Sequence, residues 1–306
     1  MSAATLLLPA RNRLAGARLS PAVARALGRA ERGSTEPGER AQLLRHFRLV
    51  PAHWPVAALT RQLDAGDAAR SAWVRADPAH VAPDMQGARL MGYGPSLDID
   101  EHDVAALLPA LKPLFGDAGL LLDAPVPSRW YLQVAAGLEL PEFAEPGEVL
   151  GADLFDQLPQ GVAGRRWRAL MTEAQVLLHQ HPWNRERAAC GKPAINSLWF
   201  WGGGELPQAV TSPHAQVRSR EPLLRALALA SGADGDDGST VDALVDLRHL
   251  RSLEQIDGEA IAPLLAALQR RELGQLVLDF QDGARFAIDN RQRWRVWRRP
   301  LATLDA

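Results

Sequence analysis

The chain has 306 residues, 47% of them hydrophobic, and a formal net charge of −2 at pH 7. This apolar content is enough for one large or two smaller packed domains, and it excludes a disordered protein. The near-neutral charge, without a basic block, argues against nucleic acid as a partner. A single cysteine, Cys190, excludes an intramolecular disulfide and a cysteine-rich zinc site. The apolar run at 3–9 is too short to span a bilayer, so we expect a cytoplasmic protein that does not bind membranes.

The first half of the chain alternates apolar runs with helix-forming stretches. Glycines and prolines interrupt the pattern at 31–40, and the acids at 100–103 indicate a helix start, because acids favour the positive N-terminal end of a helix. In chain order, the predicted elements are a buried strand at 3–9, helices at 21–30, 41–47 and 55–63, strands at 71–81 and 88–93, a helix at 100–114, and strands at 119–124 and 128–134.

The second half begins with an apolar stripe from Trp167 to His181, whose helical spacing predicts a helix. It is followed by a buried strand at 197–201, a helix at 221–230, a solvated loop at 231–240, a strand at 241–247, a helix at 258–271, and strands at 274–280 and 284–289. Strands that alternate with helices favour an α/β fold with a mainly parallel sheet core. The antiparallel-looking middle of the chain is expected to form an inserted α+β lobe.

One stretch concentrates groups that suit an anionic ligand: HPWNRERAACGKPAINSLWFWGGGELP, residues 181–207. Asn184, Arg187, Lys192 and Asn196 can donate hydrogen bonds to an anion, and the triple glycine at 202–204 lets the backbone approach a ligand closely. The alternative is purely structural: a capped helix, a turn and a buried strand, with glycines needed for a tight bend. No GK[ST] follows the glycines, so this is not a phosphate-binding P-loop.

Other polar residues carry weaker signals. Ser34 is a possible nucleophile on a loop, or equally a helix N-cap or a turn residue. His179 and His181 lie two residues apart, so on a helix they cannot chelate one metal ion. The acids of DGDDG at 234–238 resemble a calcium loop only loosely, and a solvated loop is favoured. In RQRWRVWRRP at 291–300, two tryptophans lie among five arginines, and packing of both tryptophans on the core is favoured over a partner surface.

The 181–207 stretch resembles a segment of the archaeal-type, cofactor-independent phosphoglycerate mutases. The matching positions are His181, Pro182, Asn184, Arg187, Gly191, Asn196, Gly202, Gly204 and Pro207. Weaker similarity extends to GDAARSAWVRADP, SRWYLQV and SREPLLRALALASGA. The combination of TLLLPA near the start, WVRADPAHV, SRWYLQV and the stretch from His181 to Gly204 also resembles the RpfE-type bacterial regulatory proteins.

The resemblance to the mutases implies an alkaline-phosphatase-like fold, in which an α/β core holds two divalent metals and a nucleophilic serine, and an inserted lobe supplies ligand-binding groups. It implies a core formed by 1–70 and 193–306 and a lobe formed by 71–192. The substrate-side positions that it implies are Arg75, Arg129, His181, Asn184, Arg187, Asn196, Gly202 and Gly204.

The chain departs from the mutase pattern where the metals would bind. The family's first strand ends in an Asp-Gly metal motif, but here the strand runs into Ala10 and Arg11. Of the family's C-terminal aspartate and histidine clusters, only Asp246, His249 and Asp279 remain as possible remnants. Two metals need a complete set of carboxylates and imidazoles. We therefore expect no metal cofactor, and manganese, zinc or magnesium only if the chain is catalytic.

The sequence thus predicts a regulatory, non-catalytic relative of these mutases that binds a small phosphorylated or carboxylated metabolite. Arg75, Arg129 and Arg187 are expected to neutralise the anion, and Asn184 and Asn196 to orient it. One alternative is an active mutase or phosphatase that uses Ser34. Another is a scaffold that binds a protein partner.

Overall fold

The computed structural model describes residues 2–14, 18–84, 87–135, 137–235 and 242–304. The chain divides into two compact units, which we call unit 1, residues 1–50 with 209–306, and unit 2, residues 51–208. Unit 1 is therefore discontinuous, and unit 2 is inserted into it. No helix within the described ranges is both long enough and apolar enough to cross a membrane.

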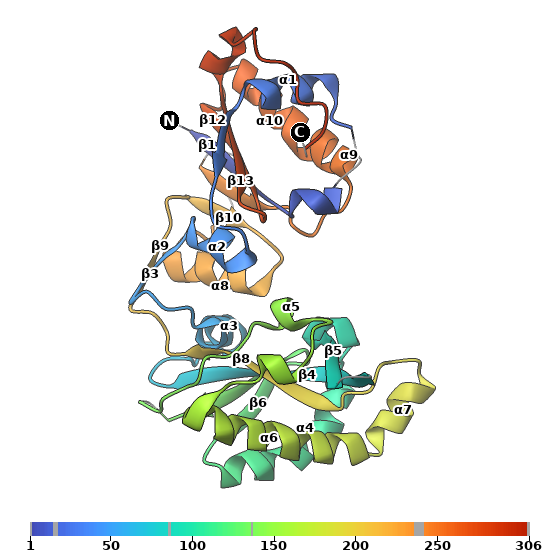
Figure 1. Ribbon diagram of the computed structural model, residues 1–306. Helices are drawn as coiled ribbons and strands as arrows, with labels where there is room; N and C mark the ends of the chain where they lie inside the picture. The colour runs from blue at the N-terminus through green and yellow to red at the C-terminus, as the bar shows by residue number, and fades with distance from the viewer. Residues whose placement is uncertain (1, 15–17, 85–86, 136, 236–241, 305–306) are drawn as a thin grey trace. The chain divides into compact units, whose positions relative to one another are not determined.

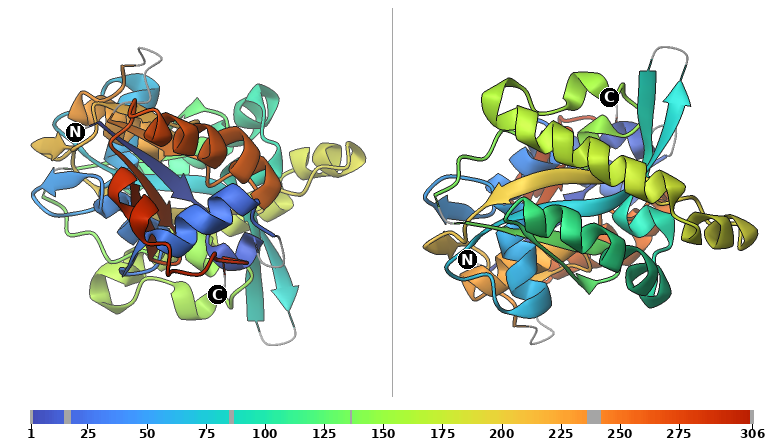
Figure 2. Two further views of the ribbon diagram at one scale, coloured as in Figure 1. Left: turned by 90° about the horizontal axis from the view of Figure 1, so that it is seen from above. Right: turned by 90° about the horizontal axis from the view of Figure 1, so that it is seen from below.

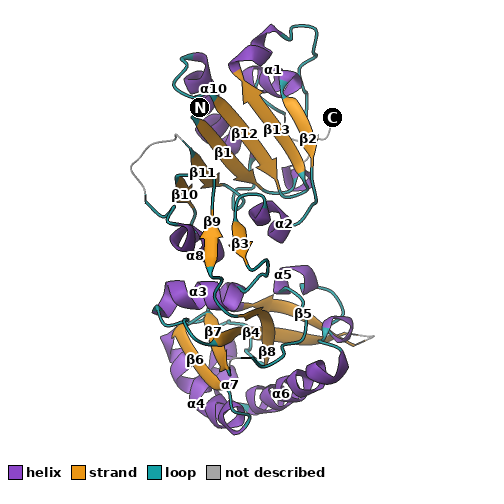
Figure 3. Cartoon of the chain, turned by 90° about the vertical axis from the view of Figure 1, so that its left-hand side faces the viewer, coloured by secondary structure: helices purple, strands orange, loops and turns teal. Residues whose placement is uncertain are grey.

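Unit 1 is built on a six-stranded mixed sheet, in which β1, β12, β13 and β2 are seen side by side (Figure 3). Four neighbouring strands are parallel, and two further strands continue the sheet in antiparallel fashion. The order is β10 (Gln216–Arg218), β11 (Ala243–Asp246), β1 (Ala3–Leu8), β12 (Gln275–Phe280), β13 (Ala284–Asp289) and β2 (Glu31–Ser34). A separate pair joins β3 (Arg48–Val50) to β9 (Ala209–Thr211). The predicted α/β class is confirmed, and the stretch expected only to interrupt the pattern at 31–40 contributes the edge strand β2.

Side chains of β1 alternate between the two faces of this sheet, and the apolar ones on one face pack against helices of unit 1. Leu6 and Leu8 join a core with α1 and α10, so Leu7 between them faces the opposite side of the sheet. Ser20 caps α1 by accepting a hydrogen bond from the Val23 amide. The helical segments of unit 1 are η1 (Arg11–Leu14), α1 (Pro21–Arg29), α2 (Glu39–Leu44), α8 (Pro222–Ser231), α9 (Leu253–Ile256), η4 (Asp257–Ile261), α10 (Ala262–Gln269) and η5 (Asn290–Trp294).

Unit 2 is built around one long strand, β4 (Ala72–Asp84), whose partners are all antiparallel. On one side β4 pairs with β8 (Ser197–Gly204). On the other side the first residues of β4 pair with β7 (Arg129–Val134), and its last residues pair with β5 (Gly87–Tyr93). The sheet ends at β6 (Leu121–Val126), which pairs with β7. β4, which has partners on both sides, is buried along most of its length, and the first half of β8, whose partner among the described strands is β4, is buried as well.

Two long helices, α4 (Glu101–Asp117) and α6 (Gly161–Gln180), lie side by side on one face of the unit 2 sheet, and α3 (Val56–Ala65) lies on the other (Figures 1 and 2). Asp100 caps α4 by accepting hydrogen bonds from two amides of its first turn, which confirms the predicted start. The stripe on α6 is buried as predicted at Trp167, Leu170, Met171, Ala174 and Leu178, whereas Leu177 is exposed and His181 is half-buried. The shorter segments are η2 (Gly94–Leu97), α5 (Pro146–Val149), η3 (Phe155–Gln157) and α7 (Trp183–Ala189).

The boundaries of the units differ from the predicted division at 70/71 and 192/193. Residues 51–70 and 193–208 belong to unit 2 because α3 packs on β4 and β8, and β8 pairs with β4 along most of its length. The acidic loop at 234–238, considered as a calcium site, lies largely outside the described residues.

Candidate functional site

Two carboxylates mark the carboxyl edge of the parallel strands in unit 1. Asp246 on β11 and Asp279 on β12 are both in register with Leu7 of β1. Two strand spacings place their Cα atoms about 10 Å apart. Like Leu7, they face away from the core that holds α1 and α10. Ligands of open α/β sheets bind outside this edge, so the location suits a functional site.

Asp279 is fully buried and is neutralised from within the chain. Arg45 donates to both of its oxygens, Nη2 to Oδ1 at 2.6 Å and Nε to Oδ2 at 3.0 Å. His46 Nε2 lies 3.0 Å from Oδ2, and His46 Nδ1 lies 3.0 Å from Nε2 of His214. Burial would raise the pKa of Asp279, but the hydrogen bonds from His46 and Arg45 hold it below its usual value. Asp279 is thus a charged anchor for an Arg-His-His cluster.

Asp246 is neutralised in the same way by another arginine. Arg248 donates Nε to Oδ1 at 2.8 Å and Nη2 to Oδ2 at 3.0 Å, and the Ser219 hydroxyl donates to Oδ2 at 2.7 Å. Burial favours the neutral acid, yet these contacts lower the pKa of Asp246. Arg248 also donates to Glu39 at 2.9 Å and lies 3.9 Å from Glu221. One guanidinium therefore serves three carboxylates.

These contacts test whether the edge suits the two metals that the mutase resemblance implies. A dimetal centre needs carboxylate oxygens that are free to coordinate, together with further imidazole or carboxylate ligands. Here both aspartates are held in two-point contacts by guanidinium groups. Within the described ranges, no group of three or more His, Cys, Asp or Glu side chains is placed to hold a metal ion. The residues present do not fit a two-metal site.

The remaining catalytic candidates lie apart from these carboxylates. Ser34 is the exposed last residue of β2 and pairs with Ala284. β2 lies two strands from β12 and four from β11, so Ser34 is about 10 Å from the Asp279 position and about 19 Å from Asp246 along the sheet. His249 is exposed in the turn that follows Asp246 and lines the same cavity, and no hydrogen bond or ion pair joins these two described side chains. The structure does not bring these residues together as a nucleophile with metal ligands.

A cavity of about 440 Å³ opens beside Asp246, within unit 1. Its lining combines acids and bases: Arg13, Glu39, Arg220, Glu221, Asp246, Arg248, His249 and Gln281. Arg13 and Arg220 are exposed and make no ion pair with any carboxylate that the structure describes. Burial raises the pKa of Glu221, whose carboxylate accepts from the Leu223 and Leu224 amides. The cavity therefore combines two arginines that pair with no described carboxylate with acids whose charge is already compensated or suppressed.

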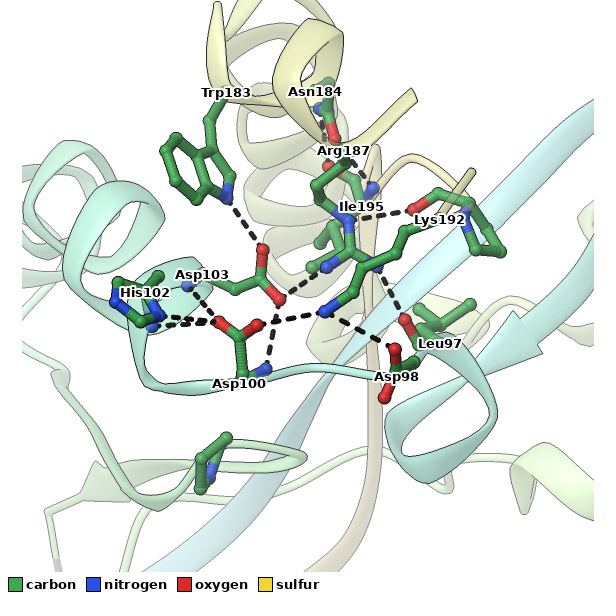
Figure 4. A network of polar contacts seen from close by, with 12 residues as sticks. Leu97, Asp98, Asp100, His102, Asp103, Trp183, Asn184, Arg187, Lys192 and Ile195 are labelled. Carbon is green, nitrogen blue, oxygen red and sulfur yellow. Dashed lines mark hydrogen bonds and ion pairs between the residues drawn. The ribbon is translucent and has the colours of Figure 1, made fainter. Parts of the chain in front are cut away.

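Among the predicted ligand-binding residues in unit 2, Arg187 has the most complete set of internal contacts (Figure 4). It is buried, and it donates to the Asp103 carboxylate, to the Leu97 carbonyl at 2.6 Å and to the Pro193 carbonyl at 2.9 Å. Trp183 Nε1 donates to the other Asp103 oxygen at 2.7 Å. Burial would raise the pKa of Asp103, and the Arg187 and Trp183 contacts lower it instead. The network fastens α7 to the start of α4.

The two predicted asparagines also serve the backbone. Asn184 donates to the Leu178 and Ile195 carbonyls at 2.8 and 2.9 Å and accepts from the Ile195 amide at 2.8 Å. Asn196 forms a matching pair of 2.8 Å hydrogen bonds with the Val81 amide and carbonyl. All of these partners are main-chain groups of unit 2, so both amides act as clasps between neighbouring segments.

His181 and the glycines complete the predicted stretch. His181 ends α6, and its Nδ1 accepts from the Trp183 amide at 3.3 Å. Gly202 has φ +64°, and a Cβ there would lie 2.8 Å from Val56 Cβ. Gly204 has φ +147°, and its Cβ would lie 2.9 Å from Pro55 Cβ. The triple glycine thus lets β8 pass close to the start of α3.

Arg75 is buried under aromatic rings and paired with an acid on its own strand. Its Nε and Nη2 donate to Asp77 Oδ1 at 2.9 and 2.6 Å, while Trp201 Nε1 donates to Oδ2 at 2.7 Å. The guanidinium carbon lies 5.3 Å from the Trp201 ring centroid. Burial raises the pKa of Asp77 in spite of the arginine beside it.

Arg129 makes a two-point ion pair with Asp64 of α3, with both N–O distances at 2.7 Å. The Tyr131 hydroxyl donates to the same carboxylate at 2.5 Å. Burial would raise the pKa of Asp64, but these hydrogen bonds lower it. Burial also raises the pKa of Tyr131 well above its usual value, so the phenol stays protonated.

The predicted ligand groups of unit 2 therefore form two separate clusters. Asn196 contacts Val81, which lies six residues after Arg75 on β4. In an extended strand, six residues separate Val81 from Arg75 by about 20 Å. Arg75, Arg129 and Arg187 each have an internal carboxylate, and an anion could bind them only by displacing it. Sequence reasoning missed Arg45, His46, His214 and Arg248, whose partners on the sheet are mostly distant in sequence. Only Arg248, two residues after Asp246, carried a local signal.

No family model matches the chain. It is 33% identical over 95 residues to a probable 2,3-bisphosphoglycerate-independent phosphoglycerate mutase of Geobacter sulfurreducens, covering 29% of this chain and 24% of that protein. It is 30% identical over 137 residues to the 2,3-bisphosphoglycerate-independent phosphoglycerate mutase of Methanosarcina acetivorans, covering 43% of this chain and 32% of that protein. The chain thus matches about a quarter to a third of the length of these curated relatives.

Among solved structures, the chain is similar to the cofactor-independent phosphoglycerate mutase from Thermoplasma acidophilum, with a TM-score of 0.43 and 16% identity. That similarity covers 95% of this chain and 90% of the other. The sequence matches to the curated proteins show that the chain has relatives among the 2,3-bisphosphoglycerate-independent phosphoglycerate mutases.

Proposed function

We propose that this chain is a non-catalytic, regulatory relative of the phosphoglycerate mutases that binds a small phosphorylated or carboxylated metabolite. The observation that carries the proposal is the pairing of Arg45 with Asp279 and of Arg248 with Asp246. At the edge where the resemblance places metals, two guanidinium groups take the positions of the cations. The carboxylates are already satisfied, so nothing remains to activate Ser34 as a nucleophile.

The same edge supports the binding of an anion. The cavity beside Asp246 presents Arg13 and Arg220, which pair with no carboxylate among the described residues, next to His249. A planar guanidinium fork matches the oxygens of a phosphate or a carboxylate and retains its charge at any physiological pH. We place the ligand here and not at Arg75, Arg129 or Arg187, because those three arginines are already neutralised by aspartates.

Calorimetric titration with 3-phosphoglycerate and 2-phosphoglycerate, in the presence of a chelator, tests this proposal. The parent protein is expected to bind at least one of these acids. Arg220→Gln is expected to weaken binding roughly 10- to 100-fold, because it removes one charge-assisted contact. The matched control is Arg270→Gln. Arg270 is an exposed arginine that pairs with Glu272 just before β12, at the opposite end of the strands.

Two outcomes would overturn the proposal. Equal weakening by Arg220→Gln and Arg270→Gln would show a non-specific charge effect, and no binding of either acid would remove the ligand class. Interconversion of the two acids after addition of manganese, abolished by Ser34→Ala, would instead establish the catalytic alternative.

A further inference from the structure

The segment from Asn290 to Leu301 is fastened to α1 by its backbone. The Leu301 amide donates to the Ala24 carbonyl at 2.8 Å. Arg29 Nη1 donates to the Arg293 carbonyl at 3.1 Å, and Arg295 Nη1 donates to the Arg29 carbonyl at 3.2 Å. A Cβ at position 28 would collide with the Arg299 carbonyl, so Gly28 allows this close approach. The segment is therefore held in a defined path along the helix.

Three large apolar side chains of this segment are exposed to solvent. Trp294, Val296 and Trp297 are 69%, 71% and 74% exposed. The prediction that the two tryptophans pack on the core is wrong: Gln292 and Leu301 take the buried positions instead. Large apolar side chains exposed together on an anchored segment mark an interaction surface.

The same surface is strongly basic, and its carboxylate Asp289 accepts hydrogen bonds from the Arg291 and Gln292 amides. Residues 290–304 contain five arginines and no acid, and α1 adds Arg25 and Arg29, again without an acid. None of these seven arginines is paired with a carboxylate in the described part of the chain. Arg293 lies over Trp294, with its guanidinium carbon 4.8 Å from the ring centroid. The surface is therefore complementary to an acidic partner.

A groove of about 160 Å³ adjoins this surface, between α1, α10 and η5. Leu265, Leu268 and Ile288 supply apolar lining, and three of the seven arginines, Arg25, Arg29 and Arg293, also line it. This volume is close to that of a cavity that accepts a single benzene ring. The groove thus suits one apolar side chain flanked by negative charge.

We propose that α1, the groove and residues 290–299 form a docking site for an acidic peptide segment of a partner protein. One apolar side chain of the peptide enters the groove, its carboxylates pair with the arginines, and Trp294 and Trp297 cover it. Tryptophan and arginine are the residues that dominate binding energy at protein interfaces. The groove has the size of a single side chain and aliphatic walls, which favours a peptide side chain over a stacked base or a lipid chain. Binding of nucleic acid or of an anionic lipid surface to the exposed tryptophans and arginines is an outcome that the test below distinguishes. This site is independent of the metabolite cavity beside Asp246.

Selection from a displayed library of random peptides, followed by fluorescence anisotropy with labelled peptides, tests this proposal. Selection on the parent protein is expected to enrich peptides with several acids around one apolar residue. The double variant Trp294→Ala/Trp297→Ala and the groove-filling variant Ala26→Phe are each expected to weaken these peptides roughly tenfold or more. Replacing the acids of a peptide by amides is expected to have a similar effect.

Controls separate docking from misfolding and from general stickiness. Val162→Ala truncates a similarly exposed apolar residue in unit 2 and is expected to leave peptide binding unchanged. Each variant is compared with the parent by circular dichroism and thermal melting. Enriched peptides without acids, or acidic peptides whose affinity is unaffected by both variants, would overturn the proposal. So would displacement of the peptide by single-stranded DNA or by phosphatidylserine vesicles that bind more tightly than any selected peptide.

Discussion

The paired arginines of unit 2 and the exposed arginines of unit 1 have the same side chain in opposite electrostatic settings. Arg75, Arg129 and Arg187 are each paired with an aspartate and surrounded by aromatic or main-chain groups. Arg220 and Arg293 have no carboxylate partner among the described residues and face solvent beside a cavity or a groove. A basic residue in a family-like motif is therefore a poor guide to ligand binding until its internal partners are known.

Removing the charge of a paired arginine is therefore expected to affect folding, and removing the charge of an unpaired arginine is expected to affect binding. A buried arginine that compensates a buried acid matters for folding, because its removal leaves an uncompensated charge. An exposed arginine without a partner matters for binding and hardly affects folding. The following experiments test this division, from the largest expected effect to the smallest.

Arg187→Met is expected to lower the free energy of unfolding by about 3–5 kcal/mol, because Asp103 is left buried without its counter-charge. Urea denaturation followed by circular dichroism measures the loss. Arg185→Met, at an exposed position two residues earlier on α7, is the matched control and is expected to change stability by less than about 0.5 kcal/mol. Equal effects at both positions would contradict the division.

Gly202→Ala is expected to destabilise the protein by about 1–3 kcal/mol, because the residue has φ +64° and its Cβ would press against Val56. Gly116→Ala, within α4 and with nothing near the added Cβ, is the control. It is expected to be neutral or slightly stabilising, since alanine favours a helix. Thermal and urea unfolding of both variants give the comparison, and a tolerated Gly202→Ala would show that β8 can move away from α3.

His214, which contacts the Asp279 cluster, is expected to make the stability of the fold depend on pH. Burial and the neighbouring His46 lower the pKa of His214 to about 4, although Asp242 opposes the shift. The unfolded chain therefore binds a proton below about pH 6.5 that the folded chain does not bind until about pH 4. Stability is expected to fall as the pH decreases through this window. In His214→Gln the melting temperature is expected to depend less on pH between 7 and 4.5, and an unchanged slope would contradict this role.

Ser34→Ala is expected to have the smallest effect. Ser34 is exposed at the end of an edge strand, so the free energy of unfolding is expected to change by less than about 0.5 kcal/mol. Calorimetric affinity for phosphoglycerates is expected to equal that of the parent, because Ser34 does not line the cavity. A large loss of affinity would bring the serine back into the site.

Local signals in the sequence predicted much of the fold. The acids at 100–103 located the start of α4, and the apolar spacing from Trp167 located the buried face of α6. The alternation of strands and helices gave the α/β class. The strand β2 was missed because its four residues are all exposed and carry no apolar signal.

The site was harder to predict because its key contacts join distant positions. Arg45 and His46 meet Asp279 more than 230 residues further along the chain, and only the sheet register shows that Asp246 and Asp279 share one edge. Nor did hydrophobicity alone predict that Trp294 and Trp297 are exposed. Their orientation depends on the anchoring of their segment at Gly28 and Leu301.

The most direct test of the central claim is the metal content of the purified protein by elemental mass spectrometry, after dialysis against manganese, zinc and magnesium and removal of free ions. Arg45 and Arg248 already neutralise Asp279 and Asp246, so the expected result is far less than one metal ion per chain. Two tightly bound metal ions per chain would contradict the account, because both arginines would have to leave their aspartates to admit them.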